Sequence, residues 1–168
     1  RRIARGAVDR PDRVLDRPEF ADYWALKWAD VLRIKAEFPG KVWPNAAQAY
    51  HRWIRSSLRE NKPLDRLARE MLTESGSNFR APPVNFYRAM QSREPTAIAA
   101  AVALTFMGVR ADKWPKQRLE GMAGFFSRIG YKATGEWKEE IVVFDPEKPV
   151  VPAVFPDGVD ARLLPDQD

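Results

Sequence analysis

The stretch FADYWALKWADVLRIK, residues 20–35, concentrates two Trp, a Tyr and a Phe within about four turns of a helix. Steps of four, four, three and four residues place its largest side chains on one stripe. The stripe consists of Phe20, Trp24, Trp28, Val31 and Lys35, with Leu32 beside it. Because so much apolar surface on one face favours burial, this pattern predicts a central core helix against which the other helices pack.

Two shorter amphipathic helices follow this stretch. Asn45 and Gln48 have the spacing of a capping box, in which the Asn side chain accepts a hydrogen bond from a first-turn N–H. The helix that they begin runs to about Arg59, and a third helix runs from Pro63 to Thr73. The tight corner between them predicts an antiparallel hairpin. Its predicted buried side chains are Tyr50, Trp53, Ile54, Ser57, Leu58, Leu64, Leu67, Ala68, Met71 and Leu72.

The next part of the chain contains a short turn at residues 85–90 and two further helices. An Ala-rich helix runs over residues 95–107, and Gly108 is its left-handed cap. A last helix begins at Pro115 and ends at Gly130. Its predicted core face consists of Leu119, Met122, Ala123, Phe126 and Ile129.

After the last helix the composition changes from helical to extended. Residues 140–145 and 150–155 are compact β-branched and aromatic runs, which predict a β-hairpin or two extended arms laid on the helical body. The predicted fold class is mainly α, an orthogonal multi-helix domain of about five helices. The helical domain covers residues 1–130, and the extension over residues 131–168 packs on it as part of a single structural unit.

The length and composition of the chain exclude several classes of protein. With 168 residues, of which 45% are hydrophobic, the chain is long enough for one domain with a real core. It contains no cysteine, which excludes disulfides, thiolate metal sites and thioether-linked haem. The net charge of +5 comes from charges of mixed sign, so we expect no nucleic-acid partner. No apolar run approaches the roughly 20 residues of a membrane span.

The amino terminus is polar, and a short helix is predicted near residues 10–15. The start, RRIARGAVDR, has neither an initiator Met nor the apolar centre of a signal peptide. We therefore expect the chain to be a fragment of a longer multidomain protein.

Loop aromatics and clustered carboxylates are the candidate functional residues. The set consists of Trp43, Trp114 and Trp137, together with Glu136, Glu139 and Glu140. Loop Trp rings form hot spots in interfaces or stack on sugars, and paired carboxylates perform glycosidic chemistry. Alternatively, the Trp rings close the ends of a small core and the carboxylates are simply solvated.

Other chemistry has no support in the sequence. His51 is the sole histidine, and no nucleophile elbow accompanies it. There is neither a Gly-rich phosphate loop nor an EF-hand pattern. We therefore predict no cofactor, no metal and no nameable catalytic residue.

Five blocks of sequence resemble one known family. They are FADYWALKWADVLRI (20–34), AYHRWIRSSLRENKPLDRLAREMLTESGSN (49–78), PPVNFYRAM (82–90), FMGVR (106–110) and GMAGFFSRIGYK (121–132). Their order and spacing are similar to those of the planctomycete cytochrome-like family of unknown function (PSCyt type), over about residues 10–155.

The resemblance implies a haem segment that this chain lacks. Many members carry Cys-x-x-Cys-His just after the block that here reads FMGVR, whereas Arg110 is followed by ADKWPKQRLEG. The family further implies an exported protein, periplasmic or extracellular, whose partners are neighbouring domains of the same polypeptide.

The favoured interpretation is a non-catalytic structural or interaction module of an exported bacterial multidomain protein, with no haem bound by this domain. The main alternative is a glycan-binding or glycan-processing domain with a polysaccharide partner. A third possibility is an accessory domain of an electron-transfer protein whose haem lies in another domain.

Overall fold

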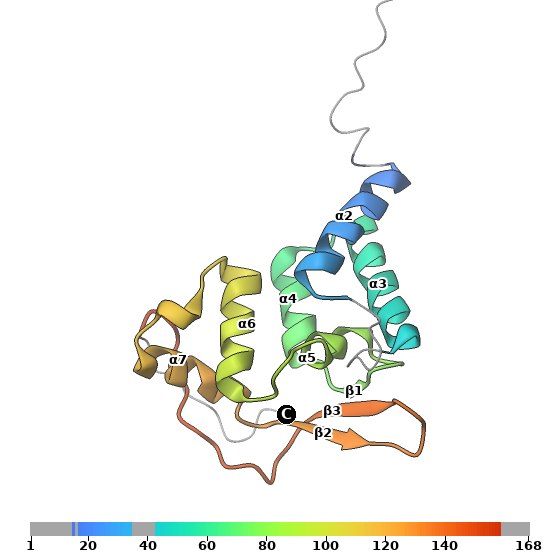
Figure 1. Cartoon of the computed structure of the whole chain (residues 1–168). Helices are drawn as coiled ribbons and strands as arrows, with labels where there is room; N and C mark the ends of the chain where they lie inside the picture. The colour runs from blue at the N-terminus through green and yellow to red at the C-terminus, as the bar shows by residue number, and fades with distance from the viewer. Residues whose placement is uncertain (1–14, 16, 35–42, 159–168) are drawn as a thin grey trace, which may run out of the picture.

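The structure, a computed structural model, describes residues 15, 17–34 and 43–158. The helices α2, α3, α4, α5, α6 and α7 form the body, and a small sheet closes one end (Figure 1). Their bounds are α2 (Pro18–Val31), α3 (Pro44–Arg59), α4 (Leu64–Thr73), α5 (Asn85–Arg88), α6 (Pro95–Met107) and α7 (Lys116–Ala123). The predicted mainly α fold with a small β element is confirmed. The helix predicted near residues 10–15 and the stripe residue Lys35 fall largely or wholly outside the described residues.

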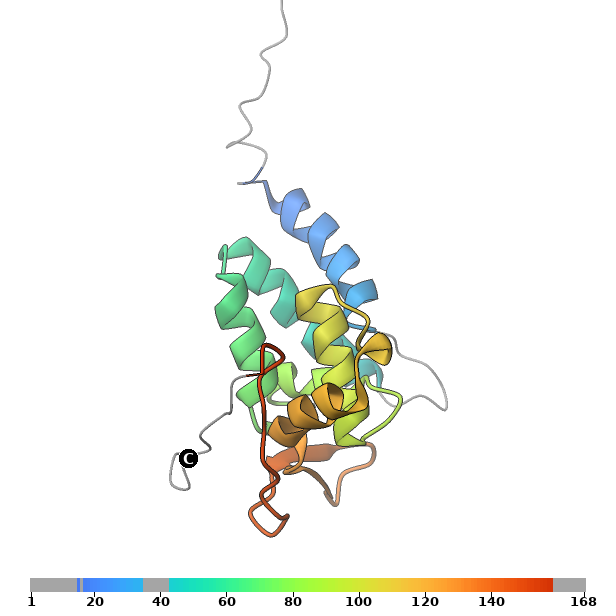
Figure 2. The same cartoon turned by 90° about the vertical axis from the view of Figure 1, so that its left-hand side faces the viewer.

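Helix α2 packs against α3 through alanines. Ala21, Ala25 and Ala29 recur every fourth residue and are buried, and Leu32 just beyond the helix is buried too. Methyl groups at the contact let the two helix axes approach closely. Figure 2 shows α2 lying along the edge of the helical body.

The prediction that the aromatic stripe of this helix is the central core face is therefore wrong. Trp24 is 42% exposed and Val31 is 52% exposed. Trp24 instead contacts its helix neighbours Phe20 and Tyr23, with ring centroids 6.2 and 5.7 Å apart. Of the stripe's aromatic rings, Trp28 is partly buried and packs against the core. Large and small apolar residues both recur every four residues along α2, on two different faces. The face that carries the alanines is the buried one.

Helices α3 and α4 run in opposite directions from a shared corner (Figure 1), as predicted. The hydroxyl of Tyr50 in α3 donates a hydrogen bond to the sulfur of Met71 in α4, at 3.3 Å, and both residues are fully buried. Leu64, predicted to be buried, is exposed because it begins α4.

The predicted capping box at the start of α3 is wrong. The helix begins at Pro44, with Trp43 as its cap residue and no side-chain cap bond. Since Pro has no N–H, the first turn has one donor fewer to satisfy. Asn45 therefore lies inside the helix, two positions beyond the cap residue Trp43.

Helix α6 ends as predicted, with Gly108 in the left-handed region at φ 65°. Helix α7 is shorter than predicted and ends at Ala123. Instead of continuing to Gly130, the chain forms a 3-10 turn and then enters a strand. Three short 3-10 helices connect the elements of the described chain: η1 (Pro82–Val84), η2 (Ala111–Lys113) and η3 (Gly124–Phe126).

The sheet contains the strands β1 (Gly76–Ser77), β2 (Ile129–Ala133) and β3 (Glu140–Phe144), in the order β1-β3-β2. Both pairings are antiparallel, with Gly76 opposite Val142 and Ile129 opposite Phe144. Strand β3 was predicted, but its hairpin partner is β2 rather than residues 150–155.

Residues 150–155 instead match the alternative of an extended arm. The Val154 N–H donates to the Gly121 carbonyl in α7, at 3.0 Å. A Cβ on Gly124 would lie 2.4 Å from the Pro152 carbonyl oxygen, so the missing side chain is what allows this close approach. The arm contributes the buried Ala153 to the molecule.

Candidate interaction site at the hairpin turn

The turn between β2 and β3, together with the first residue of β3, carries four of the six predicted site residues: Glu136, Trp137 and Glu139 in the turn, and Glu140 in the strand. The Thr134 hydroxyl organises this turn. It accepts a hydrogen bond from the Glu136 N–H, at 3.1 Å, and donates one to the Glu139 carboxylate, at 2.8 Å. The turn is therefore held by its own side chains.

Trp43 joins these residues from the start of α3. The rings of Trp43 and Trp137 lie 4.4 Å apart between centroids, with an interplanar angle of 72°. This edge-to-face arrangement is one that aromatic pairs prefer. Trp137 nevertheless stays 67% exposed, and the Lys138 ammonium lies 5.5 Å from its ring centroid.

Glu139 is fixed between two hydroxyl groups. Its carboxylate accepts hydrogen bonds from Ser77 in β1 and from Thr134, and its side chain is only 7% exposed. Arg80 lies at the edge of ion-pair distance, 3.9 Å away. The bond from Ser77, followed by that from Thr134, lowers the pKa of the Glu139 carboxyl below its usual value.

Glu140 lies between two arginines. It forms an ion pair with Arg88 of α5, and Arg93 donates two hydrogen bonds to its carboxylate, at 3.1 and 2.8 Å. The Arg93 guanidinium also covers the Tyr131 ring, 4.0 Å from its centroid. Burial lowers the pKa of Arg88 and raises that of Tyr131, although the charges around them act partly in the opposite direction.

Trp114 is not part of this cluster. It follows η2, and the segment between α6 and α7 to which it belongs lies on the opposite side of the molecule from the β2–β3 turn (Figure 1). Its ring is partly buried against the core, and the Arg118 guanidinium lies 4.3 Å from the ring centroid. The structure thus groups five predicted residues and separates one.

The residues that hold Glu139 and Glu140 in place were not predicted as site residues. Ser77, Thr134, Arg88 and Arg93 bind the carboxylates, whereas Asn78 binds the backbone of Glu140 and is itself held by Asn85. Asn78 exchanges backbone and side-chain hydrogen bonds with Glu140, at 3.0 and 2.9 Å, and Asn85 donates to the Asn78 carbonyl, at 2.8 Å. Both asparagines have no exposed surface. Their signal in the sequence was polar residues within the apolar block PPVNFYRAM and the loop SGSN, but spacing alone does not show which residues meet.

The chemistry of this cluster favours recognition over acid–base catalysis. A glycosidase acid requires a carboxyl group whose pKa is raised, so that it carries a proton near neutral pH. Glu139 is surrounded by donors that favour its ionised form, and Glu140 lies between two cations. What remains accessible is the Trp137 ring with its charged neighbours.

The resemblance predicted that a haem-attachment segment after Arg110 is missing from this chain. Residues 110–114 are Arg, Ala, Asp, Lys and Trp, and they consist of the η2 turn with its two cap residues. These residues do not fit a covalently attached haem, which requires thiols and an axial imidazole. Within the described chain, no group of three His, Asp or Glu side chains is placed to hold a metal ion.

None of the helices in the described ranges has the length and apolar character that a membrane crossing requires.

Comparison with protein families gives a match over most of the chain. Residues 7–130 match the family PSCyt2, described as a protein of unknown function (DUF1549). No curated protein matches, and no solved structure matches. Because the matched residues cover well over half of the chain, the protein belongs to the PSCyt2 family of unknown function.

Proposed function

We propose that this domain is a non-catalytic interaction module, with no haem of its own, in an exported bacterial multidomain protein. The observation that carries the proposal is the exposed Trp137 ring, held against Trp43 on a turn that side-chain hydrogen bonds fix. Trp is the residue most enriched at the energetic centres of interfaces. A ring fixed before binding loses little entropy when a partner covers it.

The proposed partner is a neighbouring domain of the same polypeptide, in the periplasm or outside the cell. Glu136 and Lys138 flank the ring with charges of both signs, as the polar rim of an interface requires. The carboxylates of Glu139 and Glu140 keep the turn in place from beneath, which is a structural use of these groups.

Calorimetric titration of the 168-residue chain with the separately expressed neighbouring domains tests this proposal. Trp137→Ala is expected to weaken binding by about thirtyfold or more, since a hot-spot residue contributes about 2 kcal/mol or more. Trp24→Ala is the matched control, because Trp24 is also exposed but lies on α2. Equal affinities for the wild type and Trp137→Ala would refute this use of the turn.

The proposed lack of haem has its own test. The purified chain, produced in cells that attach haem covalently, is expected to show no Soret absorption after denaturation. A Soret band that stays with the denatured protein would overturn this part of the proposal.

A glycan-binding role is the second candidate, favoured by the same exposed ring. Aromatic faces stack on sugar rings, and Trp137 offers such a face on a fixed turn. Electrophoresis in gels that contain bacterial or algal polysaccharides tests it. Retardation of the wild type that Trp137→Ala abolishes and Trp24→Ala retains would favour the glycan over the protein partner.

A further inference from the structure

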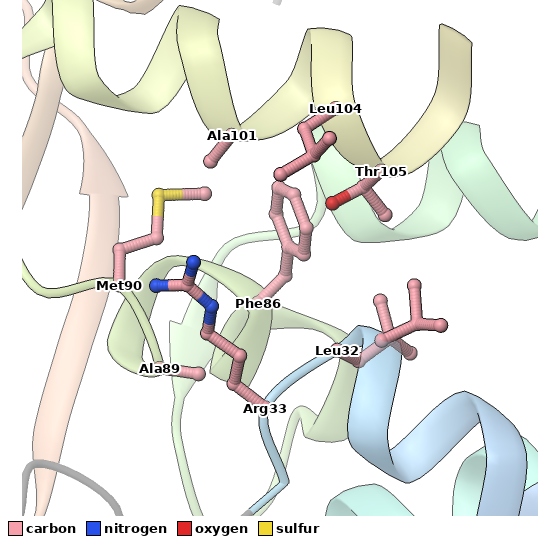
Figure 3. Close-up of a pocket in the computed structure, with 9 residues that line it drawn as sticks. Leu32, Arg33, Phe86, Ala89, Met90, Ala101, Leu104 and Thr105 are labelled. Carbon is pink, nitrogen blue, oxygen red and sulfur yellow. The ribbon is translucent and has the colours of Figure 1, made fainter. Parts of the chain in front are cut away.

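A pocket lies away from the hairpin turn, between the end of α2, helix α5 and helix α6 (Figure 3). Its volume is about 310 Å³. Most of its wall is apolar: Leu32 follows α2, Phe86 and Met90 form one side, and Ala101 and Leu104 of α6 form the other. This volume lies at the lower end of the range for ligand pockets, so it suits one short chain or ring and not a helix.

Arg33 is the one charged side chain among the described residues that line this pocket. It extends from the end of α2 toward Phe86 and Met90 (Figure 3). Among the described residues, no carboxylate lies within ion-pair distance of its guanidinium. The Thr105 hydroxyl of α6 is a further polar group of the wall. An apolar wall with one cation that has no carboxylate partner among the described residues is complementary to an apolar chain that ends in an anion.

The backbone at Arg33 gives a second reason to single out this side chain. Arg33 has a left-handed φ of 55°, and the Ile34 N–H donates to the Ala29 carbonyl, at 2.8 Å. This bond pattern ends α2 in the position that Gly normally occupies. A non-glycine residue in the left-handed region costs about 1–2 kcal/mol. Gly would therefore end the helix with less strain than Arg. The difference that Arg33 makes is a cationic side chain at the pocket.

We propose that this pocket binds a small aliphatic carboxylate, such as a medium-chain fatty acid. The alkyl chain would lie between Phe86, Met90 and Ala101, and the carboxylate would bind the Arg33 guanidinium. Arginine suits this role because its planar fork of donors matches a carboxylate. The site is independent of the proposed interaction at Trp137, so either proposal can fail without the other.

The test is a titration of the 168-residue chain with octanoate, followed by NMR of the methyl groups of Leu104 and Met90. Octanoate is expected to bind more tightly than octanol by about fivefold, the usual limit for an exposed ion pair. Hexanoate is expected to bind about fifteenfold more weakly than octanoate, because each buried methylene contributes about 0.8 kcal/mol. The absence of saturable octanoate binding would overturn the proposal.

Two variants locate the ligand. Arg33→Gly is expected to fold at least as stably as the wild type, since it relieves the left-handed strain, and to bind octanoate and octanol equally. Ala101→Leu fills the pocket and is expected to remove the binding of both. Arg69→Gln, on exposed α4 surface, is the control and is expected to change neither affinity. Unchanged octanoate affinity in Arg33→Gly, or in Ala101→Leu, would show that the acid binds elsewhere.

Discussion

Ala25 has no exposed surface, and its methyl group lies where α2 packs on α3. The neighbouring Trp24 ring is much larger, yet it does not enter this contact and lies in a partly exposed aromatic group with Phe20 and Tyr23. Close helix contacts favour small side chains, because the axes are nearer where the contact residues are small. The size of a residue is therefore a poor guide to its place in this interface.

Substitutions at these two positions are expected to have unequal costs. Ala25→Leu adds volume to a filled contact and is expected to lower the free energy of unfolding by about 1–3 kcal/mol. Trp24→Ala removes a partly exposed ring and is expected to cost at most about 1 kcal/mol. Urea denaturation measures both values. A larger loss of stability in Trp24→Ala than in Ala25→Leu would indicate that the aromatic stripe is the core face of α2 after all.

The Ser77 hydroxyl provides a second prediction for a single residue. Because Ser77 is the main cause of the lowered pKa of Glu139, Ser77→Ala is expected to raise this pKa toward the ordinary value of about 4.3. A lowered pKa in the folded state stabilises the protein above the unfolded pKa, and this contribution disappears as the pH falls through the folded pKa. Ser77→Ala is therefore expected to be less stable than the wild type near neutral pH.

The measurements are an NMR titration of the Glu139 carboxyl carbon and thermal melts from neutral to acidic pH. The part of the stability difference that comes from the Glu139 charge is expected to fade on acidification. When Glu139→Gln is present in both proteins, the stability difference caused by Ser77→Ala is expected to be independent of pH. An unchanged Glu139 titration in Ser77→Ala would show that Ser77 does not determine the charge state.

At the scale of the elements, α7 and its 3-10 extension carry glycines where the extended arm of residues 150–155 packs on them. Gly121 and Gly124 lie three residues apart on the helix and its 3-10 extension, and the arm residues Pro152 and Val154 lie against them. A Cβ at Gly121 would lie 3.0 Å from the Val154 Cβ, and one at Gly124 would lie still closer to the Pro152 backbone. The two glycines thus leave the space in which the extended arm packs against the helix.

Gly124→Ala is expected to displace this arm. The new methyl would meet backbone atoms of Pro152 and Ala153, at 2.4 and 2.8 Å, which cannot turn aside as a side-chain end can. The expected cost is about 1–3 kcal/mol, with faster hydrogen exchange at the Val154 N–H. Gly135→Ala is the control, because nothing lies within 4 Å of its added Cβ. Equal exchange rates in wild type and Gly124→Ala would contradict the close approach.

Several elements were predictable because their signals are local. The left-handed cap at Gly108, the helix that follows Pro95 and the corner between α3 and α4 depend on residues near one another in sequence. Strand β2 was missed because Phe126 and Ile129 continue the apolar period of the preceding helix, and only pairing with β3 makes this segment extended. Likewise, Trp137 was predictable as an exposed loop residue, but its contact with Trp43 joins two distant segments.

At the scale of the whole molecule, the sheet ties the carboxy-terminal part to the helical body. The family match ends at residue 130, inside β2, whereas β3 contributes the buried Val142 and pairs with β1. Glu140 also neutralises Arg88, whose burial otherwise disfavours its charge. We therefore expect the residues beyond the match to belong to the same folding unit.

Truncation tests this expectation. A chain that ends at residue 130 loses β3 and leaves a partly buried arginine without its carboxylate, so it is expected to lose cooperative unfolding. A chain that ends at residue 158 keeps every described element and is expected to melt as the full chain does. Differential scanning calorimetry compares the two. A cooperative transition of the shorter chain at an unchanged temperature would show that the helical part is complete by itself.

The pairing of β1 with β3 also has a consequence for the speed of folding. The bond between Asn78 and Glu140 joins residues 62 apart in sequence, whereas the bond between Tyr50 of α3 and Met71 of α4 joins residues 21 apart. Contacts between distant residues form only after the loss of chain entropy on closing the intervening loop. The α3–α4 hairpin is therefore expected to form early and the two-residue strand β1 to find its partner last. Until then one edge of β3 stays unpaired and open to strands of other chains, so the slowest contact is also the one that protects the protein from aggregation.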